Sequence, residues 1–238
     1  MKIALLGYGK MGKEIEKISI SRGHSVIIKM DEHNAKQTGK EELTQADVAI
    51  EFSTPQTAYE NICKCFEAGI PVVVGTTGWY EKLVEISKPC NAGGHALFYA
   101  ANFSIGVNLF FKLNEQLALM MNSQNGYEPS IEEVHHIHKK DAPSGTAITL
   151  AEGLLKHSKN KKKWVNKDSA DPHSLSIISI REDEVPGTHT VKYSSSIDEI
   201  EIRHTAHNRQ GFALGAVLAA EWIKGKKGIF GMQDLLSF

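Results

Sequence analysis

The sequence has few cysteines, no long apolar run and almost no net charge. Its 238 residues include three Cys, too few for a disulfide framework, which favours a reducing compartment such as the cytoplasm. No stretch approaches the roughly 18 uncharged apolar residues of a membrane-spanning helix, and the first apolar run is too short for a secretory signal. With 27 basic and 28 acidic side chains, the chain lacks the positive surplus typical of proteins that bind nucleic acid or membranes through charge.

The remaining composition is that of a folded protein. Hydrophobic residues make up 41% of the chain and charged residues 23%, which excludes disorder, and 20 Gly with 7 Pro exclude a coiled coil. The length suits one large or two small domains. Histidine is in surplus, because the chain has 11 and three of them lie in the segment Glu-Val-His-His-Ile-His-Lys-Lys at 133–140.

Short apolar runs alternate with helical patterns up to about residue 100. The runs lie at 2–6, 25–30, 49–53, 71–74 and 96–99. They do not alternate between apolar and polar residues, as expected of strands that are covered on both faces. Strand–helix alternation with short connections predicts an α/β fold with a Rossmann-type, doubly wound parallel sheet.

The second half of the chain has a different pattern. The pattern predicts helices at 104–122, 144–158 and 211–223, a His-rich strand at 130–138, and strands at 174–181, 189–193 and 198–204. The polar segment 159–171, with three consecutive lysines, is interpreted as a solvated loop. Strands in succession predict a second, α+β domain with an open mixed sheet. We expect domains at 1–102 and 103–208, with the C-terminal segment 209–238 packing its helix back on the first.

A glycine-rich turn at 7–12 follows the first predicted strand and opens a helix. In the pattern Gly-x-Gly-x-x-Gly, Gly7 permits a tight turn, Gly9 lets the backbone approach a pyrophosphate, and Gly12 allows close packing of the helix. The helix N-terminus adds amide donors and positive potential. The turn predicts a dinucleotide site, and the alternative is a strand–turn–helix without a ligand.

Asp31 closes the second strand about 20 residues after the glycine-rich turn. A carboxylate there accepts hydrogen bonds from the adenosine ribose and repels a 2′-phosphate, so NADH is the expected cofactor. NADPH is also compatible with the sequence, because Lys10 and Lys13 could attract its phosphate. Loops after the other strands line the ligand crevice of such a sheet, which adds the segments 53–55, 75–78 and 100–103.

The histidine-rich segment admits three interpretations. In an extended strand, His136 and His138 share a face that is opposite to His135. A zinc site is one interpretation, but the neighbouring Lys139 and Lys140 make a dication costly, and no His-Glu-x-x-His motif or nearby Cys is present. We therefore expect no metal. The second interpretation is a strand with a purely structural role. The third is a site for an anionic substrate, in which Lys139 supplies positive charge and His donates or accepts a proton.

The residues directly after the histidine-rich segment predict the start of a helix. Pro143 and Ser144 are typical first residues of a helix, so the N–H groups near Gly145 and Thr146 are free to bind a carboxylate. Taken alone, this is a capped helix that needs no ligand. Beside the His and Lys side chains, it forms a clamp for a dianion.

The segments 135–139 and 141–147 together resemble the signature of the bacterial dihydrodipicolinate reductase family. The resemblance extends to 7–12, 75–78, 100–104 and 204–209, and so covers nearly the whole chain. It implies NAD(P)H-dependent reduction of 4-hydroxy-tetrahydrodipicolinate, the cyclic dicarboxylic product of dihydrodipicolinate synthase, on the diaminopimelate route to lysine. It also implies a homotetramer built through the sheet of the second domain.

The resemblance implies a role for each site residue. His135 is similar to the family's proton donor or acceptor and Lys139 to its second proton donor, and His136, Gly145 and Thr146 to its substrate ligands. The residues expected to bind the cofactor are Gly7, Tyr8, Gly9, Lys10, Met11, Gly12, Asp31, Ser53, Gly75, Thr76, Thr77, Ala100, Ala101, Asn102 and Phe103. The chain departs from the family pattern in its short connection between Asp31 and the third strand and at Glu32, where some dual-specificity members carry Arg. Both departures argue against a preference for NADPH and leave the chemistry unchanged.

Two other functions share the expected architecture. An aspartate- or homoserine-type dehydrogenase has a similar fold but gives no reason for the His-His-x-His-Lys segment. A non-catalytic, NADH-sensing regulator needs DNA-binding helices and a basic face, and the sequence shows neither. Cys63, Cys65 and Cys90 are assigned no role.

Overall fold

The structure, a computed structural model, describes residues 1–35, 37–208 and 210–238. It divides into two compact units. Unit 1 contains Met1–Ile105 and Gln210–Phe238, and unit 2 contains Gly106–Arg209. Arg209, which belongs to the resembling segment at 204–209 and begins the expected C-terminal segment, lies outside the described residues. Among the described residues, no helix is both long and apolar enough to cross a membrane.

Unit 1 is built on a six-stranded sheet in the order β11-β5-β4-β3-β1-β2, with every pair parallel. Its strands are β1 (Lys2–Leu6), β2 (Ser25–Met30), β3 (Val48–Glu51), β4 (Val72–Val74), β5 (Ala96–Tyr99) and β11 (Gly228–Phe230). This confirms the doubly wound parallel sheet. The strand order reverses between β1 and β3, and ligands of such sheets bind outside the carboxyl ends of the strands at this point.

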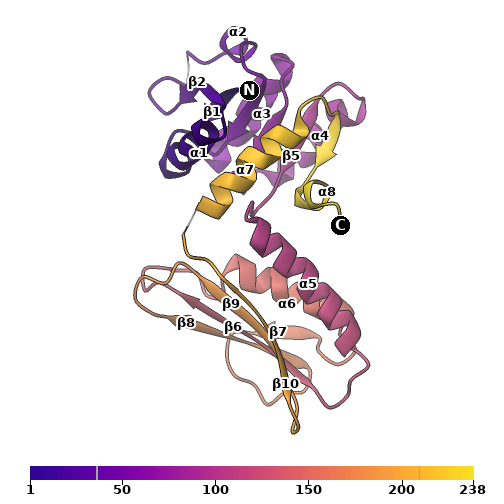
Figure 1. Cartoon of the computed structure of the whole chain (residues 1–238). Helices are drawn as coiled ribbons and strands as arrows, with labels where there is room; N and C mark the ends of the chain where they lie inside the picture. The colour runs from indigo at the N-terminus through magenta and orange to yellow at the C-terminus, as the bar shows by residue number, and fades with distance from the viewer. Residues whose placement is uncertain (36, 209) are drawn as a thin grey trace. The chain divides into compact units, whose positions relative to one another are not determined.

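Helices cover both faces of this sheet. One layer contains α1 (Lys10–Ser21), α7 (Gln210–Ile223) and α8 (Met232–Leu236); the other contains α2 (Lys40–Leu43), α3 (Pro55–Glu67), a 3-10 turn (Tyr80–Lys82) and α4 (Leu83–Asn91). Along β1, Ile3 and Leu5 pack on the first layer, and Ala4 and Leu6 on the second. In Figure 1, α1 and α7 lie side by side. Helix α7 therefore packs on the first sheet.

Unit 2 is a mixed five-stranded sheet in the order β10-β9-β6-β8-β7. Its strands are β6 (Glu128–His135), β7 (Lys163–Val165), β8 (Ser174–Arg181), β9 (Thr188–Ser194) and β10 (Glu199–Thr205). Strand β6 is antiparallel to β9 and parallel to β8. Helices α5 (Ile105–Met121) and α6 (Gly145–His157) lie on one face (Figure 1), where Ile131, Ile177 and Val191 form the core with them. The open mixed sheet is confirmed.

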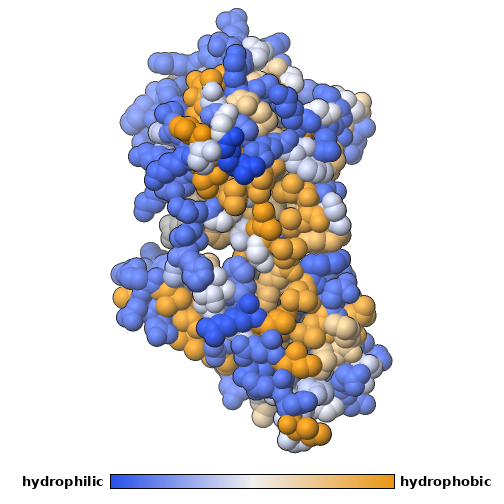
Figure 2. Space-filling view, viewed as in Figure 1, coloured by the Kyte–Doolittle hydropathy of each residue, from blue (hydrophilic) through white to orange (hydrophobic). Residues whose placement is uncertain are grey.

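Helix α5 keeps apolar side chains at its surface. Leu109, Leu113 and Met120 are 48%, 49% and 61% exposed, and Figure 2 shows apolar residues gathered over this helix. The buried side of α5, with Phe110 and Leu117, faces the core of unit 2.

The predicted strand 130–138 is wrong at its C-terminal end, because β6 stops at His135. The next residues form a turn, in which the N–H of Ile137 donates to Asp183 O at 3.1 Å and the N–H of Lys139 to His136 O at 3.1 Å. The strand rule that placed His136 and His138 on one face therefore does not apply, although their rings lie 6.2 Å apart.

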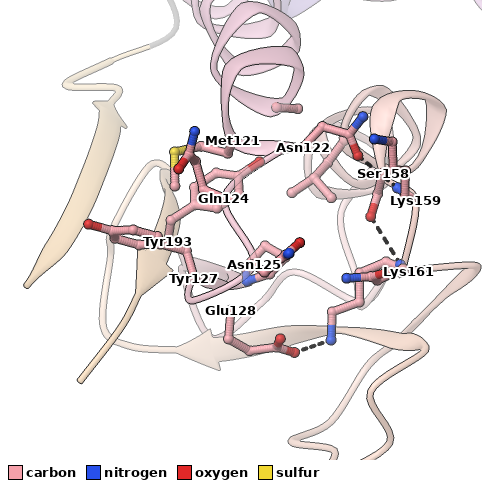
Figure 3. Close-up of a pocket in the computed structure, with 14 residues that line it drawn as sticks. Met121, Asn122, Gln124, Asn125, Tyr127, Glu128, Ser158, Lys159, Lys161 and Tyr193 are labelled. Atoms are coloured by element: carbon pink, nitrogen blue, oxygen red, sulfur yellow. Dashed lines mark hydrogen bonds and ion pairs between the residues drawn. The ribbon is translucent and has the colours of Figure 1, made fainter. Parts of the chain in front are cut away.

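The predicted solvated loop at 159–171 is also wrong. Part of it is strand β7, which pairs with β8, and Lys161 is only 3% exposed. The ammonium of Lys161 pairs with the carboxylate of Glu128 (Figure 3). The hollow beside this pair has a volume of about 50 Å³, which suits water and not a substrate.

Candidate active site

The three glycines of the 7–12 turn differ in what surrounds them. Gly7 has a φ of +105°, and a Cβ there would lie 2.1 Å from the carbonyl oxygen of Phe52. A Cβ at Gly12 would lie 2.3 Å from the carbonyl oxygen of Gly7. A Cβ at Gly9, however, would meet nothing within 4 Å. The fold therefore requires glycine at two positions, while at the third the bare backbone faces open space that a ligand can enter.

A cavity of about 740 Å³ opens at this turn, at the carboxyl ends of β1, β2 and β3. It lies at the reversal of strand order, where a dinucleotide binds in this type of sheet. Five of the residues predicted to bind the cofactor line it: Gly7, Tyr8, Gly9, Asp31 and Ser53. The other lining residues are Met30, Glu32, His33, Ala35, Thr54, Thr57, Glu60, Asn61 and Lys64. The size and the open backbone fit a nicotinamide dinucleotide.

Asp31 shapes the loop that borders this cavity after β2. Its Oδ1 accepts hydrogen bonds from the N–H groups of His33 at 2.9 Å and Asn34 at 3.2 Å. In return, the N–H of Asp31 donates to Oδ1 of Asn34 at 2.9 Å. One carboxylate oxygen therefore holds the turn, which keeps the Asp31 side chain at the cavity wall.

The loops after β3 and β4 are joined by Glu51, which the sequence analysis did not single out. Glu51 is fully buried at the end of β3 and accepts hydrogen bonds from Ser53 N–H at 3.1 Å and Asn61 Nδ2 at 3.3 Å. Ser53 N–H also donates to Thr76 Oγ1 at 2.9 Å. Burial raises the pKa of the Glu51 carboxyl, against the effect of these hydrogen bonds. An acidic residue that ends an apolar strand is the signal that could have revealed it.

The remaining predicted cofactor residues do not line this cavity. Lys10, Met11 and Gly12 form the first turn of α1. The loop with Gly75, Thr76 and Thr77 follows β4, and its Gly75 lies against the Phe52 ring, where a Cβ would come within 2.1 Å. The segment with Ala100, Ala101, Asn102 and Phe103 follows β5. Phe103 is 2% exposed and packs in the core with Phe52 and Phe98.

In unit 2, the second group of predicted residues lies at the end of β6. His135 is 7% exposed, and its Nδ1 lies 3.4 Å from Oε2 of Glu133, which is fully buried. His189, on the adjacent strand β9, lies 3.7 Å from the same carboxylate, and its ring meets that of His135 edge to face with centroids 4.9 Å apart. Glu133 and His189 belong to this site although the sequence analysis did not include them.

Charge and burial set the protonation of this group. Burial and repulsion from His189 lower the pKa of His135 to about 4, against the attraction of Glu133. Burial alone would raise the pKa of Glu133, but hydrogen bonds from His189, Ser144 and Ser179 hold it well below its usual range. Near neutral pH, a neutral imidazole therefore stands beside a buried carboxylate.

Lys139 lies in the loop between β6 and α6. Its Nζ donates to both carboxylate oxygens of Asp141, at 2.8 and 2.7 Å, and this bonding lowers the pKa of Asp141. Arg181 fixes the same loop by donating to the carbonyl oxygens of Lys139 at 3.3 Å and Asp141 at 2.7 Å. Arg181 was missed because it comes from β8, opposite His135 in the strand register.

The N-terminus of α6 completes the site. Ser144 caps it, accepting a hydrogen bond from Ala147 N–H at 3.2 Å. Gly145 and Thr146 begin the helix, where backbone N–H groups have no partner within the helix. Nδ1 of His136 is buried and has no hydrogen-bond partner among the described residues. These groups offer hydrogen-bond donors of the kind that bind a carboxylate.

Glu133, His135 and His189 have their ligand atoms within 4.8 Å of one another, close enough to hold a metal ion. The carboxylate is already engaged, because Ser144 N–H donates to both of its oxygens and Nη2 of Arg181 lies 3.4 Å from Oε1. A fixed guanidinium at this distance repels a dication. The surroundings of this carboxylate therefore disfavour a metal ion.

Comparisons with known proteins identify the family of the chain. Residues 1–103 match the family described as Dihydrodipicolinate reductase, N-terminus, and residues 106–236 match Dihydrodipicolinate reductase, C-terminus. A 4-hydroxy-tetrahydrodipicolinate reductase of Christiangramia forsetii is 52% identical over 237 residues, covering 100% of this chain and 98% of that protein. A 4-hydroxy-tetrahydrodipicolinate reductase of Neisseria meningitidis is 36% identical over 201 residues, covering 82% of this chain and 74% of that protein.

A solved structure shares the fold. It is a dipicolinate-bound dihydrodipicolinate reductase from a Paenisporosarcina species, with a TM-score of 0.81 and 22% identity over 98% of both chains. Together, the two family matches cover nearly the whole sequence, and the 52% identity extends over its full length. The chain belongs to the dihydrodipicolinate reductase family.

Proposed function

We propose that the protein reduces 4-hydroxy-tetrahydrodipicolinate to tetrahydrodipicolinate with NAD(P)H, in the diaminopimelate route to lysine. One observation carries this proposal. The chain combines a dinucleotide-type cavity in unit 1 with a group of proton donors and carboxylate ligands, His135 to Thr146, in unit 2. A relative that matches over the whole length of this chain carries the name of this activity. An aspartate- or homoserine-type dehydrogenase has no use for this His and Lys group.

The residues of unit 2 suit a cyclic dianion. One carboxylate is bound by the N–H groups of Gly145 and Thr146, which begin α6 and have no partner within the helix, and the helix dipole adds positive potential there. His136 supplies its unpartnered ring nitrogen, and Lys139 supplies positive charge. Neutralising the substrate in this way lowers the cost of bringing it to a hydride donor.

Protonation of the substrate follows from the charges of the two candidate donors. The reduced nicotinamide supplies a hydride when it is bound, and the carbon framework that receives it must also gain a proton. The pKa of His135, lowered to about 4 by burial, leaves the imidazole neutral near pH 7. Lys139 is then the cationic donor, and His135 holds a hydrogen bond to the reacting group.

NADH is the preferred cofactor in this proposal. The cavity that holds the nucleotide is lined by the acidic Asp31, Glu32 and Glu60. Among the described residues that line it, Lys64 is the one lysine, and it is paired with Glu60 at 3.1 Å. An excess of negative charge repels the 2′-phosphate of NADPH more than the ribose of NADH.

Replacing Asp31 with Ser should reduce the preference for NADH, measured as the ratio of kcat/KM values, by roughly 5–30-fold, the equivalent of one or two kcal/mol. Serine can still accept a backbone hydrogen bond in the turn but lacks the charge. Glu41→Ser, an exposed acid in α2, is the matched control and should leave the ratio unchanged. An unaltered ratio in the Asp31 variant would contradict the assignment of this residue to the ribose.

A coupled assay tests the activity itself. Dihydrodipicolinate synthase, pyruvate and aspartate semialdehyde generate the substrate in place, and the purified protein should then consume NADH, followed at 340 nm. Mixtures without the synthase should show only background oxidation. If neither NADH nor NADPH is oxidised above background in the complete mixture, the proposed function is wrong.

The assembly and location follow the family pattern. The protein is a cytoplasmic homotetramer in this proposal, with unit 1 holding the cofactor and unit 2 the substrate and the subunit interface. The sheet face opposite α5 and α6 bears Glu132, Lys192 and Arg203, and among the described residues no helix of unit 2 covers it. All three Cys are free thiols, as in a reducing compartment.

A further inference from the structure

Glu133 is a buried acid on the face of β6 that packs toward the core of unit 2. On β6, the side chains of Ile131, Glu133 and His135 share one face, and Ile131 lies in the core of unit 2. Strand register places His189 on one side of Glu133 and Ser179 on the other. Burying a carboxylate is costly unless its oxygens are fully paired, so the position calls for a reason beyond packing.

The contacts of Glu133 reach three separate elements. Ser144 N–H, at the start of α6, donates to Oε1 at 3.0 Å and to Oε2 at 3.1 Å. From β8, Nη2 of Arg181 lies 3.4 Å from Oε1. On the other side, Oε2 faces the ring nitrogens of His135 at 3.4 Å and His189 at 3.7 Å. One carboxylate thus joins the carboxylate-binding end of α6 to the imidazole of His135.

The Nδ1 atom of His135 faces the carboxylate of Glu133. This nitrogen is buried and has no hydrogen-bond partner among the described residues, and Glu133 Oε2 is the facing acceptor. The opposite nitrogen, Nε2, lies beside Gly187, where a Cβ would come within 3.0 Å of it. Catalytic hydrogen bonds are often long without substrate and shorten in the complex.

We propose that Glu133 is a positioning residue of the reduction: its carboxylate holds His135 in the tautomer with the proton on Nδ1 and fixes the first turn of α6 beside it. The inference rests on the proposed function, in which His135 and this helix turn serve one substrate. With the proton on Nδ1, the Nε2 lone pair is free to accept a hydrogen bond from the reacting group. A carboxylate behind an imidazole orients it in this way in other enzymes.

The charged groups around the pair come from every neighbouring element. They are His189 on β9, Arg181 on β8, and Lys139 and Asp141 in the loop before α6. On β10, burial and repulsion from His189 lower the pKa of His204. Of these groups, His189 and Arg181 contact Glu133 directly, and Arg181 is positioned to hold Oε1 while Oε2 faces the imidazoles.

The tautomer of His135 can be measured directly in the wild-type protein. In protein labelled with ¹⁵N-histidine, long-range ¹H–¹⁵N spectra distinguish the protonated from the unprotonated ring nitrogen, and His135→Gln assigns the signal. At pH 7 we expect a neutral ring protonated on Nδ1. A ring protonated on Nε2 would overturn the proposal, whether or not any variant folds, and the result does not depend on reductase activity.

Glu133→Gln tests the consequence. Because Arg181 and Ser144 require an acceptor, the amide oxygen takes the Oε1 position and the NH₂ group faces His135, which forces the proton onto Nε2. We expect this change in the spectrum and a fall in kcat of about 100-fold, with NADH affinity unchanged. Glu133→Asp, which keeps the charge, should retain the wild-type tautomer.

Glu152→Gln, an exposed acid on α6, is the matched control and should match wild type in activity and spectrum. A Glu133→Gln variant that folds and keeps both the wild-type tautomer and the wild-type kcat would refute the positioning role. An Nδ1-protonated His135 in a wild-type protein without reductase activity would support the Glu133–His135 contact while refuting the proposed function.

Discussion

Replacing Lys139 with Ala is expected to lower kcat by about 10²–10⁴-fold, the range typical of a lost proton donor, and to leave NADH affinity unchanged. The imidazole of His135 cannot take over as a cationic acid near neutral pH, because burial lowers its pKa to about 4. The proposed nucleotide residues lie in unit 1 and Lys139 in unit 2. Steady-state kinetics in the coupled assay and NADH titration by fluorescence measure the two quantities separately.

Lys140→Ala is the matched control, since this neighbouring side chain is exposed and has no role in the proposed chemistry. It should retain nearly full activity. Methylamine added to the Lys139 variant should restore part of the lost rate, because a free ammonium can occupy the vacated volume and donate a proton. Equal loss of NADH binding and turnover in Lys139→Ala would show that the assignment of the two ligands to different units is wrong.

The fold of unit 1 was predictable because each strand carries its own signal. The runs at 2–6, 25–30 and 96–99 coincide with β1, β2 and β5. Strands covered on both faces are largely apolar, as in β1 and β5, while the edge strand β2 is apolar enough to be recognised although one side is exposed. The sixth strand, β11, was missed. Its three residues, Gly-Ile-Phe, include only two apolar side chains, in contrast to the Val-Val-Val of β4, and it becomes a strand by pairing with β5.

The candidate site was predictable only in part. His135, Lys139 and the start of α6 were predictable because they lie close together in the sequence and form a recognisable motif. Glu133 was passed over even though it lies two positions before His135. An acid in a strand normally faces solvent, and only the register with β8 and β9 shows that Glu133 is surrounded by Arg181 and His189.

The three lysines at 161–163 also show that local sequence does not predict whether a charged side chain is buried. A run of like charges normally indicates a solvated segment, but Lys161 is buried and paired with Glu128, 33 residues earlier in the chain. A partner so distant in sequence leaves no local signal. Burial of a charge therefore depends on tertiary pairing that periodicity cannot reveal.

Replacing Gly12 with Ala is expected to destabilise unit 1. The new Cβ would lie 2.3 Å from the carbonyl oxygen of Gly7, and this oxygen is part of the backbone and cannot rotate away. Moving α1 from β1 should cost about 3 kcal/mol, which lowers Tm by roughly 6–12 °C. Gly126→Ala, at a position where a Cβ meets nothing within 4 Å, is the control and should have a Tm close to wild type.

Replacing Gly9 with Ala should leave the stability of the protein unchanged and weaken the binding of NADH. Its φ of −81° is accessible to alanine and its Cβ meets nothing within 4 Å, so Tm should stay within about 1 °C of wild type, as for an unstrained surface substitution. The methyl group enters the space that a bound pyrophosphate needs, and NADH should bind roughly 10–100-fold more weakly. Thermal unfolding and NADH titration of both variants separate the two roles: Gly12 serves the fold and Gly9 the ligand. Normal NADH affinity in a folded Gly9→Ala protein would mean that the cofactor does not approach the backbone at this turn.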